Sequence, residues 1–518
     1  GRDFFVVPED TSPARLGVGE GDVVVARIAE YPTRNSAAVV TIESRVGSSD
    51  ELDLNVESVI ASYGLATEFP PAALAQAEGI QAGVEEALKR EPGRRDLRSL
   101  CCMTIDPTDA RDFDDAVYAA QLPDGGFELW VHIADVTHYV GWDTPIDNEA
   151  KRRTCSAYLV DRVLPMLPER LCNDVCSLRP REDRLAMSVR MELDDQGRLV
   201  SAEAMTSAIR STARLDYDTV DALLAGRVNA SALHEDQRDA QTLEEALRVL
   251  DRIRGLRERI REERGSIDFD TVEPKVTLDE EGHPTGVIVR TRTRATGLVE
   301  EAMLLANESV ARMLADREVL CAYRVHERPS PEDLRATVRP LMELGLIDGS
   351  AQREALIAGE PEAINAVLDA ARGTAGEFLA SALLLRAQKR AIYMPTNQGH
   401  YALGAQAYCH FTSPIRRYPD ELVHRALKAL LAGTLGSKEQ EQIAGQLPQL
   451  CATCSQMERA ADGAARASQR IKMAELYADH VGEAFSGVVC GCERFGLFVM
   501  LDETCAEGLL PARALGGE

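Results

Sequence analysis

The chain has 518 residues, of which 45% are hydrophobic, and its formal net charge is −26. This length and composition predict several domains with ordinary cores, and the absence of a long apolar run in the sequence argues against a membrane protein. So large an acidic excess argues, taken alone, against a nucleic-acid partner, although the field at a site depends on how nearby charges are arranged.

The first 60 or so residues are predicted to form strands. Three runs rich in Val and Ile, at Phe4 to Val7, Asp22 to Ile28 and Ala37 to Ser44, are separated by turn-forming Gly, Pro, Asn and Ser. This pattern suits part of a small β-barrel of the OB type. The aromatic rings of Phe4 and Phe5 could stack on bases, and a place in the core is the equally weighted alternative.

An acidic stretch follows a predicted helical connector over residues 70–91. It reads Thr-Ile-Asp-Pro-Thr-Asp-Ala-Arg-Asp-Phe-Asp-Asp-Ala-Val from Thr104 to Val117. Apolar residues alternate with the acids, which predicts that the stretch is packed, and packed carboxylates repel one another unless a cation or shared protons intervene. Hard divalent cations such as Mg²⁺ take oxygen ligands, and two such ions can flank a phosphodiester. The carboxylates are those of Asp106, Asp109, Asp112, Asp114 and Asp115.

Chain geometry limits how these carboxylates meet. Only a turn around Pro107 can bring Asp106 back toward the other aspartates. A calcium loop of the EF-hand type is excluded, because Ala110 and Arg111 occupy its fifth and sixth positions. A solvated acidic loop is the alternative that remains open.

The elements after the acidic stretch are predicted from composition and periodicity. Residues 128–135 form a probable buried strand, residues 237–263 a long charged helix, residues 335–390 a helical region, and helix continues to about residue 479. The 12 cysteines are scattered, as free thiols of a cytosolic protein are. Cys451 and Cys454 lack a second pair, so a zinc or redox role is the less favoured interpretation.

A second distinctive stretch reads His-Phe-Thr-Ser-Pro-Ile-Arg-Arg-Tyr-Pro-Asp from His410 to Asp420. Its two prolines fix the local backbone, and the planar fork of Arg416 can grip a phosphate. An isolated Arg-Arg pair is more often solvated surface.

The spacing Asp-x5-Asp-x-Asp-Asp within the acidic stretch resembles the catalytic motif of the RNase II/ribonuclease R (RNB) family of exoribonucleases. The second stretch resembles another signature of that family, some three hundred residues on and in family order. The resemblance covers nearly the whole chain and is nearer ribonuclease R. It implies an α/β (α+β) catalytic domain flanked by partial OB-fold β-barrels, and a processive, Mg²⁺-dependent 3′→5′ exoribonuclease that releases nucleoside 5′-monophosphates.

The resemblance assigns the metal site and the phosphate contact by matched position. Asp106 and Asp115 would ligate Mg²⁺ directly, while Asp112 and Asp114 would complete the site or orient water. Arg416 would neutralise charge developing on the phosphate. Asp114 and Arg416 are accordingly the principal catalytic candidates. His132 and Asp135 lie in a phrase that the family repeats without using it for metal, so a structural role is expected for them.

Four further positions match family residues that hold the RNA. Tyr158 and Phe269 would clamp bases near the 3′ end, and Tyr217 would lie near the scissile phosphate. Glu301 matches an active-site glutamate, although Glu300 beside it leaves the register uncertain by one residue. The alternatives are a core position for Tyr158 and, for either glutamate, a first-turn acid that favours the helix dipole.

The expected organisation has four parts: a cold-shock or OB domain over residues 1–60, a connector over 61–100, the catalytic domain over 101–480 and the start of a C-terminal OB domain over 481–518. Both ends are interpreted as cuts through domains. The expected partner is the 3′ end of single-stranded RNA, with no membrane contact, and the expected form is a cytoplasmic monomer. The competing hypothesis is an RNA-binding protein with an inactive catalytic fold, which would have lost a metal carboxylate or the arginine.

Overall fold

The computed structural model describes residues 5–6, 11–19, 22–30, 38–48, 54–269 and 273–515. Its centre is a seven-stranded sheet in the order β12-β5-β6-β7-β10-β11-β4. The end pairs β12–β5 and β11–β4 are parallel and the inner pairs are antiparallel. These strands span Arg95–Asp96 (β4), Met103–Asp106 (β5), Asp115–Gln121 (β6), Phe127–Ala134 (β7), Asp183–Leu193 (β10), Leu199–Arg210 (β11) and Ala213–Asp216 (β12).

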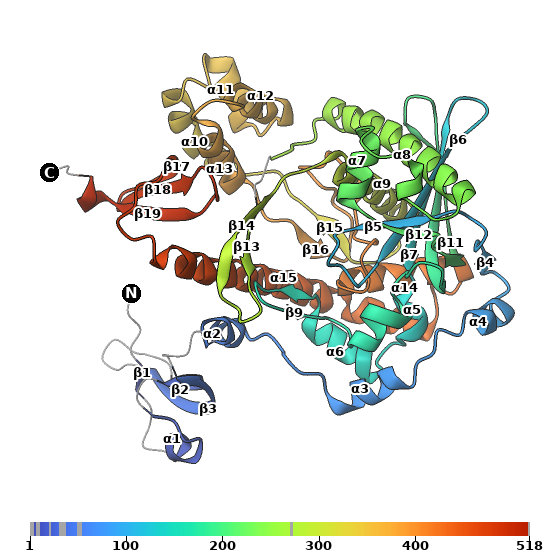
Figure 1. Ribbon diagram of the computed structural model, residues 1–518, viewed down its shortest axis with the longest axis horizontal. Helices are drawn as coiled ribbons and strands as arrows, with labels where there is room; N and C mark the ends of the chain where they lie inside the picture. The colour runs from blue at the N-terminus through green and yellow to red at the C-terminus, as the bar shows by residue number, and fades with distance from the viewer. Residues whose placement is uncertain are drawn as a thin grey trace.

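Helices cover both faces of this sheet (Figure 1). Alternate residues of β7, including Leu129, Val131 and Ile133, are buried against one helical layer, as a strand with period two requires. That layer contains α7 (Tyr217–Leu224), α8 (Gln237–Glu263) and α9 (Arg294–Ala315). The opposite layer contains α5 (Val136–Tyr139), α6 (Pro145–Arg153), the π-helical turn η1 (Arg170–Val175), α14 (Tyr418–Ala432) and α15 (Lys438–Ala478).

The predicted strand over 128–135 and the helix over 237–263 are confirmed, the first as β7 and the second as α8. The start of α8 is fixed by Asp236, whose side chain accepts hydrogen bonds from the backbone N–H groups of Arg238 and Asp239. His132 is buried with Nδ1 2.7 Å from Ser188 Oγ, and Asp135 is buried in ion pairs with Arg94 and Lys428. Both contacts are structural, as expected.

The connector consists of two helices, α3 (Pro71–Glu78) and α4 (Val84–Arg90). They are separated by a break in which Gly83 has φ +54°, a conformation that favours glycine. Residues 94–96 already contact the seven-stranded sheet, because Arg94 is buried against Asp135 and β4 pairs with β11.

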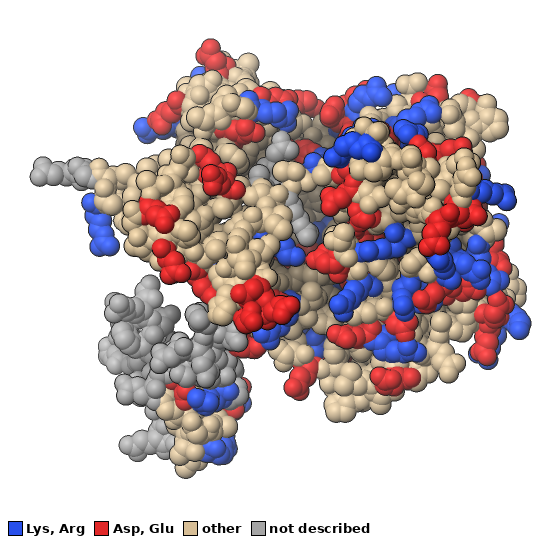
Figure 2. Space-filling model, viewed as in Figure 1, with Lys and Arg blue, Asp and Glu red and all other residues tan. Residues whose placement is uncertain are grey.

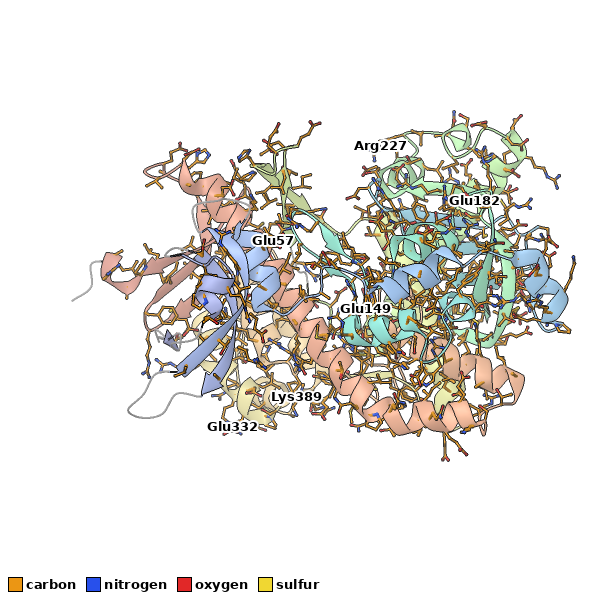
Figure 3. All side chains as sticks on the ribbon, turned by 90° about the horizontal axis from the view of Figure 1, so that it is seen from below. Glu57, Glu149, Glu182, Arg227, Glu332 and Lys389 are labelled. Carbon is orange, nitrogen blue, oxygen red and sulfur yellow. The ribbon has the colours of Figure 1, made fainter. Side chains whose placement is uncertain are left out.

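The predicted helical region is a separate cluster of four helices. Ser330 caps α10 by accepting a hydrogen bond from the backbone N–H of Asp333. In Figure 3, Glu332 of α10 and Lys389 lie in the lower part of the view, and Arg227, which follows α7, lies in the upper part. The cluster therefore stands apart from the α7 side of the sheet. Its helices are α10 (Pro331–Glu343), α11 (Ser350–Ile357), α12 (Pro361–Ala371) and α13 (Glu377–Ala387).

Helix α15 links the other parts of the molecule. Its first half packs under the sheet, and its second half contacts α2 (Leu54–Ser62) and the hairpin of β13 (Glu273–Leu278) and β14 (Pro284–Arg290). Cys451 and Cys454 are free and buried on this helix. No group of three His, Cys, Asp or Glu side chains that could hold a metal occurs among the described residues.

Small β-structures lie at both ends (Figure 1). The three predicted N-terminal strands are confirmed as a sheet in the order β1-β3-β2; Phe4 lies outside the described residues, as does the side chain of Phe5. The C-terminal strands form an antiparallel sheet, β17-β18-β19. These elements are β1 (Phe5–Val6), α1 (Ser12–Arg15), β2 (Asp22–Glu30), β3 (Ala38–Ser48), β17 (Gly487–Glu493), β18 (Gly496–Leu501), β19 (Glu507–Pro511) and η3 (Ala512–Ala514).

Short elements complete the fold. They are β8 (Ala157–Tyr158), β9 (Val163–Leu164), η2 (Ala230–Ala232), β15 (Tyr323–Val325) and β16 (Ile392–Met394). The mixed helix and strand architecture with a small β-domain at the N-terminus confirms the predicted fold class. Among the described residues, no helix combines the length and apolar character needed to cross a membrane.

Candidate active site

The acidic stretch forms the end of β5, a loop and the start of β6. Asp106 is the last residue of β5 and Asp115 is the first of β6, and these two strands are antiparallel neighbours. The predicted turn at Pro107 is confirmed, because the N–H of Ala110 donates to the carbonyl of Pro107 at 3.1 Å. Arg214 of β12 donates to the carbonyls of Pro107 and Thr108, at 2.8 and 2.7 Å. The turn thus brings Asp106 and Asp115 to the same edge of the sheet.

The electrostatics of this edge suit a bound cation. Burial, and after it the charge of Asp115, raises the pKa of Asp106. Burial also raises the pKa of Asp115, and raises the pKa of Asp114 well above its ordinary value. Asp106 Oδ2 is buried and has no hydrogen-bond partner among the residues that the structure describes. A carboxylate oxygen in that state is costly unless a cation or a proton meets it.

The donor set is all oxygen, which suits Mg²⁺ rather than zinc. The described aspartates do not by themselves form a cluster of three that could hold a metal. Mg²⁺ usually takes only one or two carboxylates and completes its shell with water and substrate phosphates. The carboxylates of Asp106 and Asp115 therefore fit this ion as part of a shell that the substrate would complete.

The two distinctive stretches of the sequence meet at Asp114. This residue is 4% exposed, and its Oδ1 accepts a hydrogen bond from the N–H of Ile415 at 2.9 Å. Its Oδ2 lies 3.6 Å from Nε of Arg416, whose side chain is 47% exposed. Asp114 is therefore held in place from the protein side, while the guanidinium of Arg416 stays accessible to a substrate phosphate.

The segment that carries Arg416 is anchored by Asp420 at the start of α14. Asp420 is fully buried, accepts two hydrogen bonds from Arg417 at 2.8 and 3.0 Å and accepts another from the N–H of Ser413 at 2.7 Å. Phe411 donates its N–H to Oδ1 of Asn307 on α9 at 2.8 Å. Of the two adjacent arginines, Arg417 is thus structural, and Arg416 is the one that faces the aspartates.

Tyr158 lies beside this segment. The N–H of Ser156 donates to the carbonyl of Arg416 at 3.0 Å, and the N–H of Tyr418 donates to the carbonyl of Thr154 at 2.8 Å. The hydroxyl of Tyr158 is 3.5 Å from Asp112 Oδ2, and the side chain is 43% exposed. An exposed ring at the edge of the carboxylates is available for stacking on a base, so the core alternative for Tyr158 is wrong.

Tyr217 also reaches this edge. In the parallel pair of β12 and β5, Asp216 lies opposite Asp106, and Tyr217 is the next residue along the chain. The start of α7 is fixed here, because Asp216 accepts the N–H of Thr219 at 2.8 Å and α7 begins at Tyr217. Tyr217 is partly buried against the sheet core.

Glu301 is positioned differently from the aspartates. Helix α9 begins at Arg294, where Thr293 and Thr296 form a capping box, so Glu300 and Glu301 lie beyond the first turn. The helix-dipole alternative for these glutamates is therefore wrong. Glu301 is 2% exposed and accepts a 2.8 Å hydrogen bond from Nε of Arg261 on α8, and burial raises its pKa to about 6.

Phe269 packs against the hydrophobic cluster of α10–α13, at the end of a described segment. Among the described contacts, none joins Phe269 to Tyr158 or Glu301 to the aspartates. The structure therefore gathers Asp106, Asp112, Asp114, Asp115, Tyr158, Tyr217 and Arg416 around one edge of the sheet, and leaves the other two candidates on neighbouring elements.

Two positioning residues escaped the analysis of the sequence. Ser177 accepts the N–H of Phe113 at 3.0 Å and donates to the carbonyl of Arg111 at 2.9 Å, so it fixes the loop just before Asp114. Nothing around Ser177 in the sequence signals this contact. Arg214, which holds the turn at Pro107, lies three residues before the candidate Tyr217, and this short spacing is a signal that could have found it.

Comparison with known proteins agrees with this geometry. The family model described as the RNB domain matches residues 94–433, and that of the cold shock domain matches residues 1–70. The chain is 37% identical to ribonuclease R 1 of Lactococcus lactis over 96% of its own length and 59% of that relative. It is 39% identical to ribonuclease R of Aquifex aeolicus, over 96% of this chain and 68% of the relative.

A solved structure is also similar: Mycoplasma genitalium RNase R in complex with ribose-methylated single-stranded RNA. The TM-score is 0.89 at 28% sequence identity, and the match covers 99% of this chain and 78% of that one. The chain thus spans 59% of the length of the first of these relatives and more of the others.

Proposed function

We propose, from the premise that this chain belongs to the ribonuclease R group of the RNB exoribonuclease family, that it degrades single-stranded RNA from the 3′ end. The reaction would be hydrolysis, in which water adds across the terminal P–O3′ bond. One nucleoside 5′-monophosphate leaves, and the shortened RNA keeps a 3′-hydroxyl. The biological role would be RNA decay and processing.

The observation that carries this proposal is the approach of Arg416 to Asp114. The two sequence signatures lie far apart in the chain, but they meet in the structure. The backbone N of Ile415 lies 2.9 Å from Oδ1 of Asp114, and Nε of Arg416 lies 3.6 Å from Oδ2 of Asp114. Arg416 would hold a phosphate oxygen and neutralise charge that develops there, an interaction that usually dominates such catalysis. Its partial exposure leaves its donors accessible.

The cofactor proposed for this site is Mg²⁺. Asp106 and Asp115 would hold it, with Asp112 and Asp114 beside them. When bound, the ion would supply Lewis-acid chemistry and lower the pKa of a ligated water. The protein groups contribute orientation: Asp114 is fixed by Ile415, and the loop around it by Ser177 and Arg214.

Aromatic and acidic side chains would position the RNA. Tyr158 would stack on a base near the 3′ end, where its ring is exposed. Tyr217 would lie near the scissile phosphate because it follows the residue opposite Asp106. Phe269 as a second stacking residue and Glu301 as a positioning residue rest on the family resemblance, since their contacts here are with α10–α13 and with Arg261.

The distribution of surface charge answers the objection that so acidic a chain should not bind RNA. Figure 2 shows Lys and Arg intermingled with Asp and Glu over the part of the molecule that carries α7, α8 and α9. The acidic excess therefore does not make that face uniformly negative, and the positive charges of Arg214 and Arg416 act on the aspartates at the site.

The test is incubation of the chain with 5′-end-labelled single-stranded RNA, with Mg²⁺ or with EDTA. Progressive shortening from the 3′ end with release of 5′-monophosphates in Mg²⁺, and intact RNA in EDTA, is the expected result. Intact RNA in both conditions, together with retained RNA binding, would instead support the inactive RNA-binding protein as the correct function.

A further inference from the structure

A cavity lined by arginines lies outside the candidate active site. It has a volume of about 230 Å³ and is bounded by the turn between β10 and β11, the end of α8 and the middle of α9. Its charged lining consists of Arg198, Arg257, Arg264, Arg312 and Glu308, and we call it the arginine cavity. Such a volume is many times the roughly 10–15 Å³ that one water molecule needs, so a small oxyanion fits.

The charges in the arginine cavity do not balance. Arg264 and Glu308 neutralise each other through two hydrogen bonds, at 3.0 and 2.5 Å. Within the described parts of the chain, no carboxylate lies at ion-pair distance from Arg198, Arg257 or Arg312. Three positive charges therefore remain in a molecule whose net charge is −26.

Arg257 is the member whose position most requires a ligand. It is 5% exposed, and its Nη1 makes a long hydrogen bond of 3.3 Å to the carbonyl of Gly197. Its Nε is buried without a partner among the described residues, and so is Nε of Arg264. Burial lowers the pKa of Arg257, as expected for a cation deprived of water. A buried cation without an opposite charge at ion-pair distance is costly, and an anion in the cavity beside it would offset that cost.

The arginine cavity lies at the opposite end of the sheet from the aspartates. Met187 of β10 is opposite Ile133 of β7, which is opposite Asp115 of β6. From Met187, β10 continues to Leu193 before the turn that holds Gly197. Six strand residues span roughly 20 Å, so the cavity is separate from the candidate active site.

We propose that the arginine cavity binds a small polyphosphate anion, of which pyrophosphate is the simplest example. Guanidinium groups pair with phosphoryl oxygens through parallel hydrogen bonds, and three unpaired arginines suit more than one phosphoryl group. The apolar residues of the lining are Leu199, Ile260 and Leu305, which are aliphatic. A nucleobase would find no ring to stack on among these described side chains, so the phosphoryl groups are the part recognised.

Titration calorimetry of the full chain with pyrophosphate tests this proposal. EDTA is present so that a metal ion cannot hold pyrophosphate at the aspartates. The double variant Arg198→Gln/Arg312→Gln removes two exposed cations and keeps buried Arg257, so folding is retained. Its affinity for pyrophosphate is expected to fall by at least about tenfold. Arg259→Gln, an exposed arginine of α8 outside the cavity lining, is the matched control and should bind as the parent chain does.

A second titration, with a short single-stranded oligoribonucleotide, separates a free anion from the phosphates of RNA. An unchanged affinity for RNA in the double variant supports the small anion. A loss of RNA affinity as large as the loss for pyrophosphate would assign the cavity to the RNA backbone and overturn the proposal. Equal pyrophosphate binding by the parent chain and the double variant, or none by either, would also overturn it. None of these measurements depends on RNA hydrolysis, so the proposed exoribonuclease activity is tested separately.

Discussion

The carboxylate of Asp114 accepts a hydrogen bond from the backbone N–H of Ile415, 2.9 Å away and 301 residues later in the chain. This contact joins the acidic loop to the segment that presents Arg416. A shift of one segment would move the carboxylate of Asp114 relative to the guanidinium of Arg416. We therefore expect the distance between these two groups to be sensitive to changes in the loops. A small misplacement of catalytic groups can cost a large part of the rate.

Asp114→Asn should lower RNA hydrolysis by orders of magnitude and leave RNA binding intact. Asparagine can still accept the N–H of Ile415 through its carbonyl oxygen, so the loop keeps its place, while the negative charge near Arg416 is lost. Single-turnover hydrolysis of labelled RNA and a filter-binding assay measure the two quantities.

Asp109→Asn is the matched control for this change. Asp109 belongs to the same loop, but its side chain is 66% exposed and its ion pair with Lys275 is long, at 3.7 Å. Near-parental hydrolysis is expected for it. If Asp114→Asn also turned over RNA at a near-parental rate, the assignment of Asp114 to catalysis would be wrong.

Tyr158→Ala should lengthen the final product while changing the rate on long RNA little. Removing an exposed ring eliminates stacking on a base, worth about 1–3 kcal/mol, so short RNAs would dissociate before the last cuts. Tyr158→Phe keeps the ring and loses only the weak 3.5 Å contact with Asp112, so it should give the parental product. Gel analysis of limit digests measures this. The same product length for all three proteins would show that Tyr158 has no role in holding RNA.

Much of the fold follows from local sequence patterns. The bounds of α8 were predicted because a long charged run marks them, and β7 because it is an apolar run of strand length. The start of α9 was misjudged, because its capping box uses two threonines, Thr293 and Thr296, before the residues that suggested a helix. The helix-dipole alternative for Glu300 and Glu301 failed for that reason.

The site was less accessible to prediction than the fold. The turn at Pro107 followed from chain geometry, because carboxylates only nine residues apart need a reversal to meet. The contact between Asp114 and Ile415 depends on tertiary packing, and no local pattern near either residue encodes it. The roles of Phe269 and Glu301 came from the family resemblance alone, and their described contacts with other elements do not test those roles.

Glu301→Gln should lower the free energy of unfolding by about 3 kcal/mol, because it removes the short 2.8 Å ion pair of the buried guanidinium of Arg261 and leaves it only the longer 3.8 Å contact with Glu300. Glu300→Gln is the control; its side chain is 41% exposed and pairs with Arg292 at the surface, so it should cost about 0–1 kcal/mol. Urea unfolding gives both values. Turnover measured well below both melting points then tests the positioning role: a lower kcat for Glu301→Gln alone supports it, and a lower kcat for Glu300→Gln alone would shift the register by one residue.

Glu421→Gln should stabilise the protein increasingly as the pH rises from about 5 to about 8. Glu421 is fully buried, both its carboxyl oxygens lack hydrogen-bond partners within the described part of the chain, and burial raises its pKa to about 8. The unfolded chain loses this proton near the ordinary pKa of 4.5. The folded state therefore loses stability, relative to the unfolded state, as the pH rises between these two values. Glutamine removes this pH dependence.

Melting temperatures at several pH values, in EDTA, measure the effect of Glu421→Gln. The difference between variant and parent should grow with pH up to about 8 and then level off. Glu343→Gln, with a side chain that is 66% exposed, should show no such trend. A difference for Glu421→Gln that stays constant or shrinks as the pH rises would contradict a raised pKa at this position.

RNA binding should depend on salt only modestly, and Arg416→Ala should lower catalysis far more than affinity. A chain with a net charge of −26 can hold RNA only through a few cations that line its path, with stacking supplying the rest. Each phosphate contact with a single strand adds about −0.7 to the slope of log K against log salt, so we expect a slope shallower than about −3. Titration of labelled poly-A at several KCl concentrations, with Ca²⁺ in place of Mg²⁺, gives the slope.

Arg416 contributes only one of these contacts, so its loss should change the slope by about one contact while turnover in Mg²⁺ falls by orders of magnitude. Arg179→Ala is the matched control, because its side chain is 44% exposed and pairs with Asp174 and Glu182 on the surface. Arg179→Ala should leave both the salt slope of RNA binding and the turnover in Mg²⁺ unchanged. A steep slope of log K against log salt would mean that many cations hold the RNA and that the acidic surface does not restrict RNA binding. Equal losses of affinity and turnover in Arg416→Ala would show that Arg416 serves to bind RNA rather than to stabilise charge during hydrolysis.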